Sequence, residues 1–274
     1  PVRFVALAAG HEHLLLLDAA GRVWACGHGE GGKLGLGDEA SRYAPELVPG
    51  LGSAPETRVV AVAAGGMHSL AATAAGALLS WGSGCWGALG HGNLATAKTP
   101  MRVAGLGASR AVAVAAGDAH SLVLDSTGAV FSFGNGWNGR LGHGAEGHET
   151  KPRPVEGVRE AARGARVVDI SAGGAHSLAR TADGSLLAWG FGWCGQLGLL
   201  DDRSRLAPAR VPTFGPRQGG EAVRAVAVAA GGMHTVAIAE DGRVFSWGSA
   251  DEPGRLGRTH PPPHDATPQA VRLE

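Results

Sequence analysis

Five histidines recur along the chain at nearly even spacing, and their type and pattern most invite a chemical role. His13, His68, His120, His176 and His234 are separated by 55, 52, 56 and 58 residues. Imidazole nitrogens bind zinc, but one ion needs all its ligand nitrogens within about 2.1 Å. Equivalent residues of neighbouring repeats would be a whole sheet apart, about 10 Å. The pattern therefore predicts structural histidines, each bonded to a backbone group of the adjoining turn and joining one repeat to the next.

Glycine-rich turns follow the histidines, and four of them match the dinucleotide fingerprint GxGxxG. That fingerprint binds pyrophosphate only where it opens a helix, whereas here each run leads into Leu-Gly and a polar loop. The first run resembles a phosphate-binding loop up to Lys33, but Leu34 replaces the Ser or Thr that would hold Mg²⁺. We therefore predict turn glycines and no cofactor. The four runs are Gly27/Gly29/Gly32, Gly82/Gly84/Gly87, Gly134/Gly136/Gly139 and Gly190/Gly192/Gly195.

No arrangement of nucleophiles predicts catalysis. Ser69, Ser121 and Ser177 each directly follow a repeat histidine, and adjacent residues of a strand point to opposite faces. The three cysteines lie far apart with no CxxC pair, which argues against a zinc site and favours a reducing compartment. We expect no catalytic residue, no metal and no enzymatic activity.

The elements around these residues repeat as a unit. The pattern of each unit predicts four strands. The first is narrow and apolar and ends at Gly, the second begins with the histidine, the third is of the GxLLxWG type, and the fourth is a Pro-containing edge strand. Four short strands in about 50 residues predict an all-β β-propeller with five four-stranded blades in a single domain, 1–274. Residues Val158 to Arg166 interrupt the pattern as a short helical turn. The predicted repeats are 2–56, 57–109, 110–163, 164–221 and 222–274.

The combination AAGxxHSL, SWGxGxxGxLGxG and PxxV resembles the regulator-of-chromosome-condensation repeat family, and it recurs five times over essentially the whole chain. The resemblance implies a propeller; the founding member and a plant UV-B photoreceptor of the same fold have seven blades. It also implies a guanine-nucleotide exchange activity toward a small GTPase. The photoreceptor's G-W-R-H-T motif is absent, since Gly66-Met67, Gly174-Ala175 and Gly232-Met233 stand at its Trp and Arg positions. Light sensing by that mechanism is therefore not expected.

Two ways of completing the ring remain open. Val2–Ala9 reads as a first strand, and Pro268–Leu273 reads as a Pro strand. Pairing the N- and C-terminal strands in a shared blade would close a ring of five and remove two open edges. Alternatively, the five repeats are a fragment of a seven-bladed ring.

Tryptophans supply the candidate binding residues. Trp24, Trp81, Trp189 and Trp247 fall on third strands and are predicted to fill the space between sheets. Trp86, Trp137 and Trp193 fall inside the glycine turns, on the rim, where each ring either lies over the neighbouring blade's turn or anchors a partner. Cationic residues border them. The predicted partner-binding residues are Trp86, Trp137, Trp193, Arg140, His148, Lys151, Arg203 and Arg205.

The net charge and the distribution of apolar residues limit the classes of partner that the chain can bind. Lys and Arg total 24 and Asp and Glu total 24, and this zero balance argues against nucleic acid as a direct ligand. No apolar run reaches the length of a membrane span. We expect a cytoplasmic or nuclear protein–protein interaction scaffold that presents its loops on one propeller face. The alternative is an exchange factor for a small GTPase.

Overall fold

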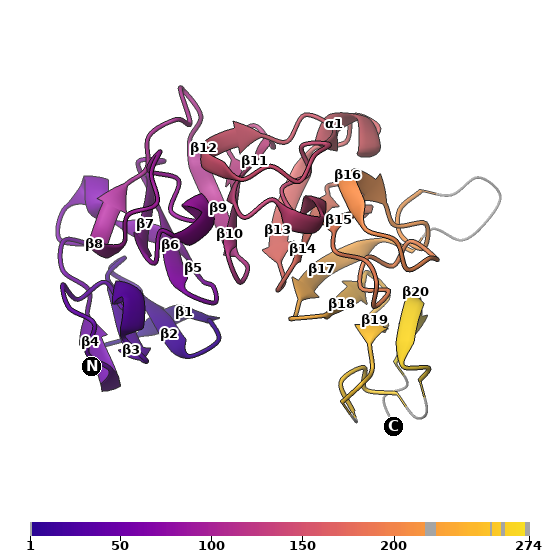
Figure 1. The fold of residues 1–274 in the computed structure, drawn as a ribbon, viewed down its shortest axis with the longest axis horizontal. Coiled ribbons are helices and arrows are strands. Elements are labelled where there is room, and N and C mark those ends of the chain that lie inside the picture. Colours follow the sequence, from indigo (N-terminus) through magenta and orange to yellow (C-terminus); the bar gives the residue numbers. More distant parts are fainter. Residues whose placement is uncertain (1, 217–222, 253, 259–260, 272–274) are drawn as a thin grey trace. The chain divides into compact units, whose positions relative to one another are not determined.

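Each repeat forms its own antiparallel sheet in the computed structural model, which describes residues 2–216, 223–252, 254–258 and 261–271 (Figure 1). Within every sheet the four strands pair in chain order, because short turns place each strand beside its successor. The predicted all-β fold of four-stranded blades is confirmed. The strands of the five sheets are β1 Phe4–Ala9, β2 His13–Asp18, β3 Val23–Gly27, β4 Arg42–Leu47; β5 Val59–Ala64, β6 His68–Thr73, β7 Leu78–Gly82, β8 Ala97–Arg102; β9 Ala111–Ala116, β10 His120–Asp125, β11 Val130–Gly134, β12 Glu149–Pro154; β13 Val167–Ala172, β14 His176–Thr181, β15 Leu186–Gly190, β16 Arg205–Arg210; and β17 Ala225–Ala230, β18 His234–Ala239, β19 Val244–Ser249, β20 His264–Ala270.

Helical segments are few and short. Three-residue 3₁₀ turns lie within the glycine runs, at η1 (Glu30–Gly32), η3 (Cys85–Gly87) and η4 (Trp137–Gly139), and η2 (Pro55–Thr57) precedes the second sheet. The predicted helical turn between the third and fourth repeats is confirmed as α1 (Val158–Ala161). Among the residues that the structure describes, no helix is long and apolar enough to cross a bilayer.

The chain divides into two compact units. The N-terminal unit comprises Pro1–Asn135 with His148–Pro154 and holds the first three sheets. The C-terminal unit comprises Gly136–Gly147 with Val155–Glu274 and holds the η4 turn, α1 and the fourth and fifth sheets. Neighbouring sheets of one unit pack through apolar side chains. Leu15 and Trp81 belong to one buried cluster of the N-terminal unit, and Leu178 and Trp247 belong to one of the C-terminal unit.

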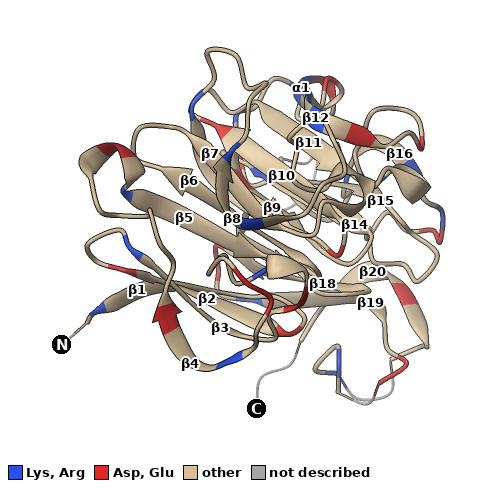
Figure 2. Cartoon of the chain, turned by 60° about the vertical axis from the view of Figure 1, so that its left-hand side comes forward, with Lys and Arg blue, Asp and Glu red and all other residues tan. Residues whose placement is uncertain are grey.

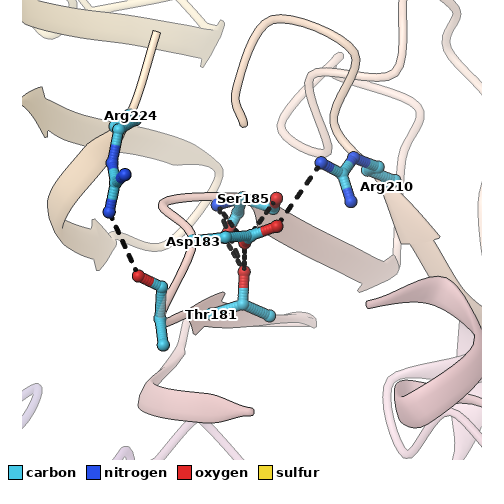
Figure 3. A network of polar contacts seen from close by, with 6 residues as sticks. Thr181, Asp183, Ser185, Arg210 and Arg224 are labelled. Carbon is cyan, nitrogen blue, oxygen red and sulfur yellow. Dashed lines mark hydrogen bonds and ion pairs between the residues drawn. The ribbon is translucent and has the colours of Figure 1, made fainter. Parts of the chain in front are cut away.

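The turn between the second and third strands of the fourth sheet depends on an Asp-Gly pair. Gly184 has a φ of 79°, in the left-handed region that Gly adopts without a steric penalty. The preceding Asp183 accepts hydrogen bonds from the Ser185 amide and hydroxyl at 3.1 and 2.7 Å, and Arg210 lies 4.0 Å away (Figure 3). Burial opposes ionisation of Asp183, but the hydrogen bonds from Thr181 and Ser185 outweigh it and lower its pKa. Arg224 holds the same turn from the fifth repeat by donating to the Ala182 carbonyl.

The predicted pairing of the N- and C-terminal strands in a shared blade is wrong. β1 pairs with β2 and β20 pairs with β19, and within the described residues they are edge strands of two different sheets. Each repeat already holds four strands joined by short turns, so a strand's partner lies a few residues away in the chain. The first and the fifth sheet each hold four strands from their own repeat, so neither takes a strand from the other.

Three of the four third-strand tryptophans are confirmed as filler between sheets. Trp81, Trp189 and Trp247 have no exposed surface. Trp24 is only partly buried, because its ring packs edge-on against Phe4 of the exposed strand β1 and its indole donates to Asp18 at 3.1 Å. It lies two residues before Cys26, which holds the position of the other three tryptophans, so it is displaced along the same face of its strand.

Candidate interaction surface

Glycine is required at each position of the GxGxxG runs because of the turn itself. Gly82 opens its turn with a φ of 106° and Gly87 ends it with a φ of 82°. A side chain on the middle Gly84 would collide with the Ala95 carbonyl of the following loop. Each of the four runs contains or precedes at most one helical turn, so the helix N-terminus of a dinucleotide site is missing. Lys33 is buried and pairs with Glu12 at 3.1 Å.

The repeat histidines join neighbouring sheets through a hydroxyl group of the next repeat. His13 Nε2 lies 2.8 Å from Ser69 Oγ, and that hydroxyl donates to the Lys33 carbonyl at 2.8 Å. The same relay runs from His68 through Ser121 to the Ala88 carbonyl, with both distances at 2.8 Å. In the C-terminal unit it runs from His176 through Thr235 to the Gln196 carbonyl, at 3.1 and 2.8 Å.

This relay corrects the expectation that each imidazole bonds directly to the backbone. The hydroxyl has one proton and gives it to a carbonyl, which can only accept. The imidazole must therefore donate from Nε2–H. Burial, reinforced by neighbouring charged groups, lowers the pKa of His13 to about 4, and burial lowers that of His68 to about 3. These histidines are neutral structural donors at neutral pH.

An indole reinforces the relay in two of the three places. Trp81 Nε1 donates to the Lys33 carbonyl and Trp247 Nε1 donates to the Gln196 carbonyl, both at 2.9 Å. Each of these carbonyls thus accepts from a hydroxyl and an indole of the following repeat. Phe133 occupies the equivalent position in the third repeat and offers no donor. In these three places, the residue before Leu-Gly is the point at which two repeats are hydrogen-bonded together.

The N-terminal unit presents one of the predicted rim tryptophans in a strained conformation. Trp86 is 40% exposed and has a φ of 60°, in the left-handed region that bulky residues rarely adopt. The equivalent positions hold Gly31 and Asn138, both left-handed and both residue types that tolerate this region. The Trp86 ring lies 4.9 Å from that of His148, tilted by 55°, and His148 is exposed. Sequence reasoning missed the strain, although the Gly and Asn at this position were a visible signal.

The C-terminal unit presents the other two rim tryptophans. Trp193 is 66% exposed and Trp137 is 48% exposed. Phe191, which the sequence analysis did not single out, lies 5.7 Å from Trp193 between ring centroids. Its position directly after Gly190, in FGW, is the signal that could have revealed it. Arg140 was predicted to border these rings at the surface, but this is wrong. It is only 8% exposed, and its guanidinium donates to the carbonyls of Trp137 and Gly174.

The remaining predicted cations differ in their availability to a partner. Lys151 and Arg203 are exposed. Arg205 is half-buried, and its guanidinium pairs with Asp201 at 2.7 Å. Along the described part of both units, Lys and Arg positions (blue) are interspersed with Asp and Glu positions (red) in Figure 2. The exposed side chains that could contact a partner are therefore mainly the rim aromatics with His148, Lys151 and Arg203.

Comparisons with known proteins agree with this architecture. The family model of the RCC1-like domain matches residues 1–274. The human E3 ubiquitin-protein ligase HERC2 is 36% identical over 258 residues, which are 93% of this chain and 5% of HERC2. The ultraviolet-B receptor UVR8 of Arabidopsis thaliana is 32% identical over 256 residues, which are 93% of this chain and 55% of UVR8. The chain thus spans about half of UVR8 and a small part of HERC2.

A solved structure is similar over the same extent. Prp20p from Saccharomyces cerevisiae, whose structure was reported with its binding properties to Gsp1p and histones, superposes with a TM-score of 0.75 and 25% identity. The alignment covers 98% of this chain and 65% of Prp20p. The family match over the full length, together with a four-stranded sheet in every repeat, shows that this chain belongs to the family of RCC1-like domains.

Proposed function

We propose that the chain is a non-enzymatic protein-binding domain that contacts a partner protein through the rim aromatics of its glycine turns. These are Trp86 with His148 in the N-terminal unit, and Trp137 and Trp193 with Phe191 in the C-terminal unit. The proposal rests mainly on Trp86, because its side chain is exposed and its backbone has a strained, left-handed φ.

A left-handed backbone costs a bulky L-residue about 1–2 kcal/mol. Asn or Gly would remove most of this cost, as they do at the equivalent positions of the neighbouring repeats. The Trp86 side chain is 40% exposed, so packing recovers only part of the cost. Strain of this kind persists most often where a residue acts on a ligand. Exposed tryptophans are also the commonest anchors of protein interfaces.

The chemistry of the rim favours a protein over other partners. Exposed apolar rings, with the exposed cation Lys151 in one unit and Arg203 in the other, are residue types of the apolar centre and polar edge of protein interfaces. The balanced charge of the chain gives nucleic acid no electrostatic advantage. The binding of Prp20p to Gsp1p and histones supports a protein partner for a domain of this family. We expect the domain to act in the nucleus or cytoplasm.

The test is affinity capture of a partner by the wild-type chain, followed by measurement of its Kd with rim variants. Trp86→Asn keeps a residue that tolerates the left-handed turn and should weaken binding at least tenfold, about 1.4 kcal/mol. Asn138→Gly changes the same turn position of the next repeat and is the matched control, with Kd unchanged. A folded Trp86→Asn chain that binds with wild-type affinity would refute the proposal.

Nucleotide exchange on a small GTPase is the second candidate. The observation that favours it is the binding of Prp20p to Gsp1p. Release of a fluorescent guanine nucleotide from small GTPases, measured with and without the chain, tests it directly. Acceleration by the wild-type chain and its loss in Trp86→Asn would place exchange at this rim. Unchanged release rates across the small GTPases tested would reject exchange and leave the scaffold proposal standing.

A further inference from the structure

The turn that carries Trp193 displays a second exposed apolar side chain, and this one has a strained backbone. Leu200 is 56% exposed and has a φ of 66°, in the left-handed region that bulky residues rarely adopt. The equivalent positions of the first three repeats hold Gly37, Gly92 and Gly144, all left-handed. Each of these four amides donates to a fourth-strand carbonyl of the next repeat, at 2.7 to 3.1 Å. The Leu200 side chain therefore stands at a position where the backbone favours Gly.

One residue of β20 supports both exposed side chains of this turn. A Cβ atom at Gly195 would lie 2.6 Å from the Ala266 amide nitrogen, and the Leu200 amide donates to the Ala266 carbonyl at 3.1 Å. The turn thus contacts Ala266 at two points. Trp193 lies two residues before the first point, and Leu200 is the second. An exposed indole and an exposed leucine are therefore held by the same short turn of the C-terminal unit.

A carboxylate that follows this turn lacks the cation that its counterpart in the first repeat has. There, Glu39 pairs at 2.8 Å with Lys98, which lies on the fourth strand of the second repeat. Asp202 stands at the position of Glu39. Ala266 stands at the position of Lys98, because the carbonyls of both accept the turn amide described above. Asp202 is exposed and forms no ion pair within the described part of the chain.

The two cations that follow Asp202 in the chain act on its neighbour instead. The Arg205 guanidinium pairs with Asp201 at 2.7 Å. Hydrogen bonding from Arg205 and the charge of Arg203 both lower the pKa of Asp201. Arg205 also donates to the Arg203 carbonyl at 3.1 Å. Both cations therefore compensate the charge of Asp201 rather than that of Asp202.

The residue that follows Trp193, Cys194, senses the same excess of negative charge. Burial raises the pKa of the Cys194 thiol, and the carboxylates of Asp251 and Asp202 raise it further. The charge of Arg255 opposes them with a smaller effect. Carboxylates thus outweigh cations beside the indole, and the turn presents a negative potential together with its apolar side chains.

We propose that this turn binds an arginine of the partner protein, with its guanidinium stacked on the Trp193 indole and paired with Asp202, and with an adjacent apolar side chain on Leu200. The inference rests on the proposed function, because it names the chemistry of the partner at the same rim. Trp gives the strongest cation–π contacts of the aromatic residues. A guanidinium both stacks on a ring and pairs bidentately with a carboxylate, which an ammonium does not. The partner's cation takes the place that Lys98 holds beside Glu39 in the first repeat.

The test titrates the full chain, labelled with ¹⁵N-tryptophan, with the peptide acetyl-Leu-Arg-Leu-amide. The Nε1–H resonance of Trp193, identified by its loss in Trp193→Phe, reports the Kd. A citrulline peptide keeps the shape of arginine without its charge, and a lysine peptide keeps the charge without the planar fork. The arginine peptide should shift the resonance saturably. The citrulline peptide should bind about tenfold more weakly, because it loses the cation–π contact and the ion pair, and the lysine peptide should also bind more weakly.

Two variants of the chain test the missing cation. Asp202→Asn removes the carboxylate, and Ala266→Lys supplies within the chain the cation that Lys98 supplies in the first repeat. Each should weaken binding of the arginine peptide about threefold and leave the Kd of the citrulline peptide unchanged. Glu39→Gln changes the equivalent carboxylate, which is already paired, and is the matched control with no change in Kd.

Equal affinity for the arginine peptide and either analogue would overturn the proposal, and so would wild-type affinity in both Asp202→Asn and Ala266→Lys. The captured partner separates this inference from the proposed function. If Trp86→Asn weakens the partner while Asp202→Asn and Ala266→Lys leave its Kd unchanged, the rim binds the partner without an arginine at this turn, and only this inference fails. If Trp86→Asn leaves the partner's Kd unchanged, the proposed function itself fails.

Discussion

Removal of the Ser69 hydroxyl tests whether the relay stabilises the fold. His13 is only 4% exposed, and Ser69→Ala leaves its Nε2–H without an acceptor. An unsatisfied buried donor costs about 1–3 kcal/mol. The Lys33 carbonyl still accepts from Trp81 at 2.9 Å, so the loss should be close to the middle of that range, about 2 kcal/mol.

Ser121→Ala should cost more than Ser69→Ala. The Ala88 carbonyl accepts from Ser121 at 2.8 Å, and Phe133 stands where an indole would give it a second donor. Both ends of the relay therefore lose a partner, which adds about 1 kcal/mol for the carbonyl. The expected losses are about 2 kcal/mol for Ser69→Ala and about 3 kcal/mol for Ser121→Ala.

Urea unfolding measures both losses, read from the shift of the midpoint at constant slope. Ser53→Ala removes an exposed hydroxyl and should stay within about 0.5 kcal/mol of wild type. Trp81→Phe combined with Ser69→Ala should exceed the sum of the two single losses, because the Lys33 carbonyl then loses both donors. A Ser69→Ala loss below 0.5 kcal/mol would refute the relay, and equal losses for Ser69→Ala and Ser121→Ala would refute the role of the indole.

Three further outcomes are expected. Trp193→Ala removes a side chain that is 66% exposed, so it should lower the free energy of unfolding by at most about 2 kcal/mol. Trp189→Ala removes a fully buried side chain of the same repeat and should lower it by about 3–5 kcal/mol. Equal losses for the two variants in thermal unfolding would place Trp193 in the core. Burial lowers the pKa of His68 to about 3, below its value of about 6.5 in the unfolded chain. As the pH falls, the unfolded state therefore binds the proton first. The free energy of unfolding should be constant above about pH 6.5 and decrease as the pH drops below it. This fall amounts to about 2 kcal/mol per buried histidine by pH 5, and a chain with His68→Gln whose acid limb is as steep as wild type would contradict that assignment. Calorimetry with ATP, GTP, NAD or zinc should show no specific heat of binding, and a stoichiometric micromolar signal from any of them would show that a glycine turn or a histidine binds a ligand after all.

Much of the fold followed from the sequence because its determinants are local. Each strand pairs with its neighbour in the chain, so period-two patterns and short turns were enough to predict five four-stranded sheets. The glycines of the turns are required by backbone geometry within a few residues, as with the left-handed Gly184 after Asp183. The helical turn at α1 was predicted for the same reason.

Only the tertiary structure decided which groups meet across sheets. The alternation of a strand showed that Ser69 points away from its own His68, but its actual partner, His13, lies 56 residues away, across the stacking of two sheets. The same long-range packing buries Arg140 beneath the rim and leaves Trp24 only partly buried beside Phe4. These outcomes depend on how the side chains of adjacent sheets pack against each other, and the sequence pattern of a single repeat does not determine that packing.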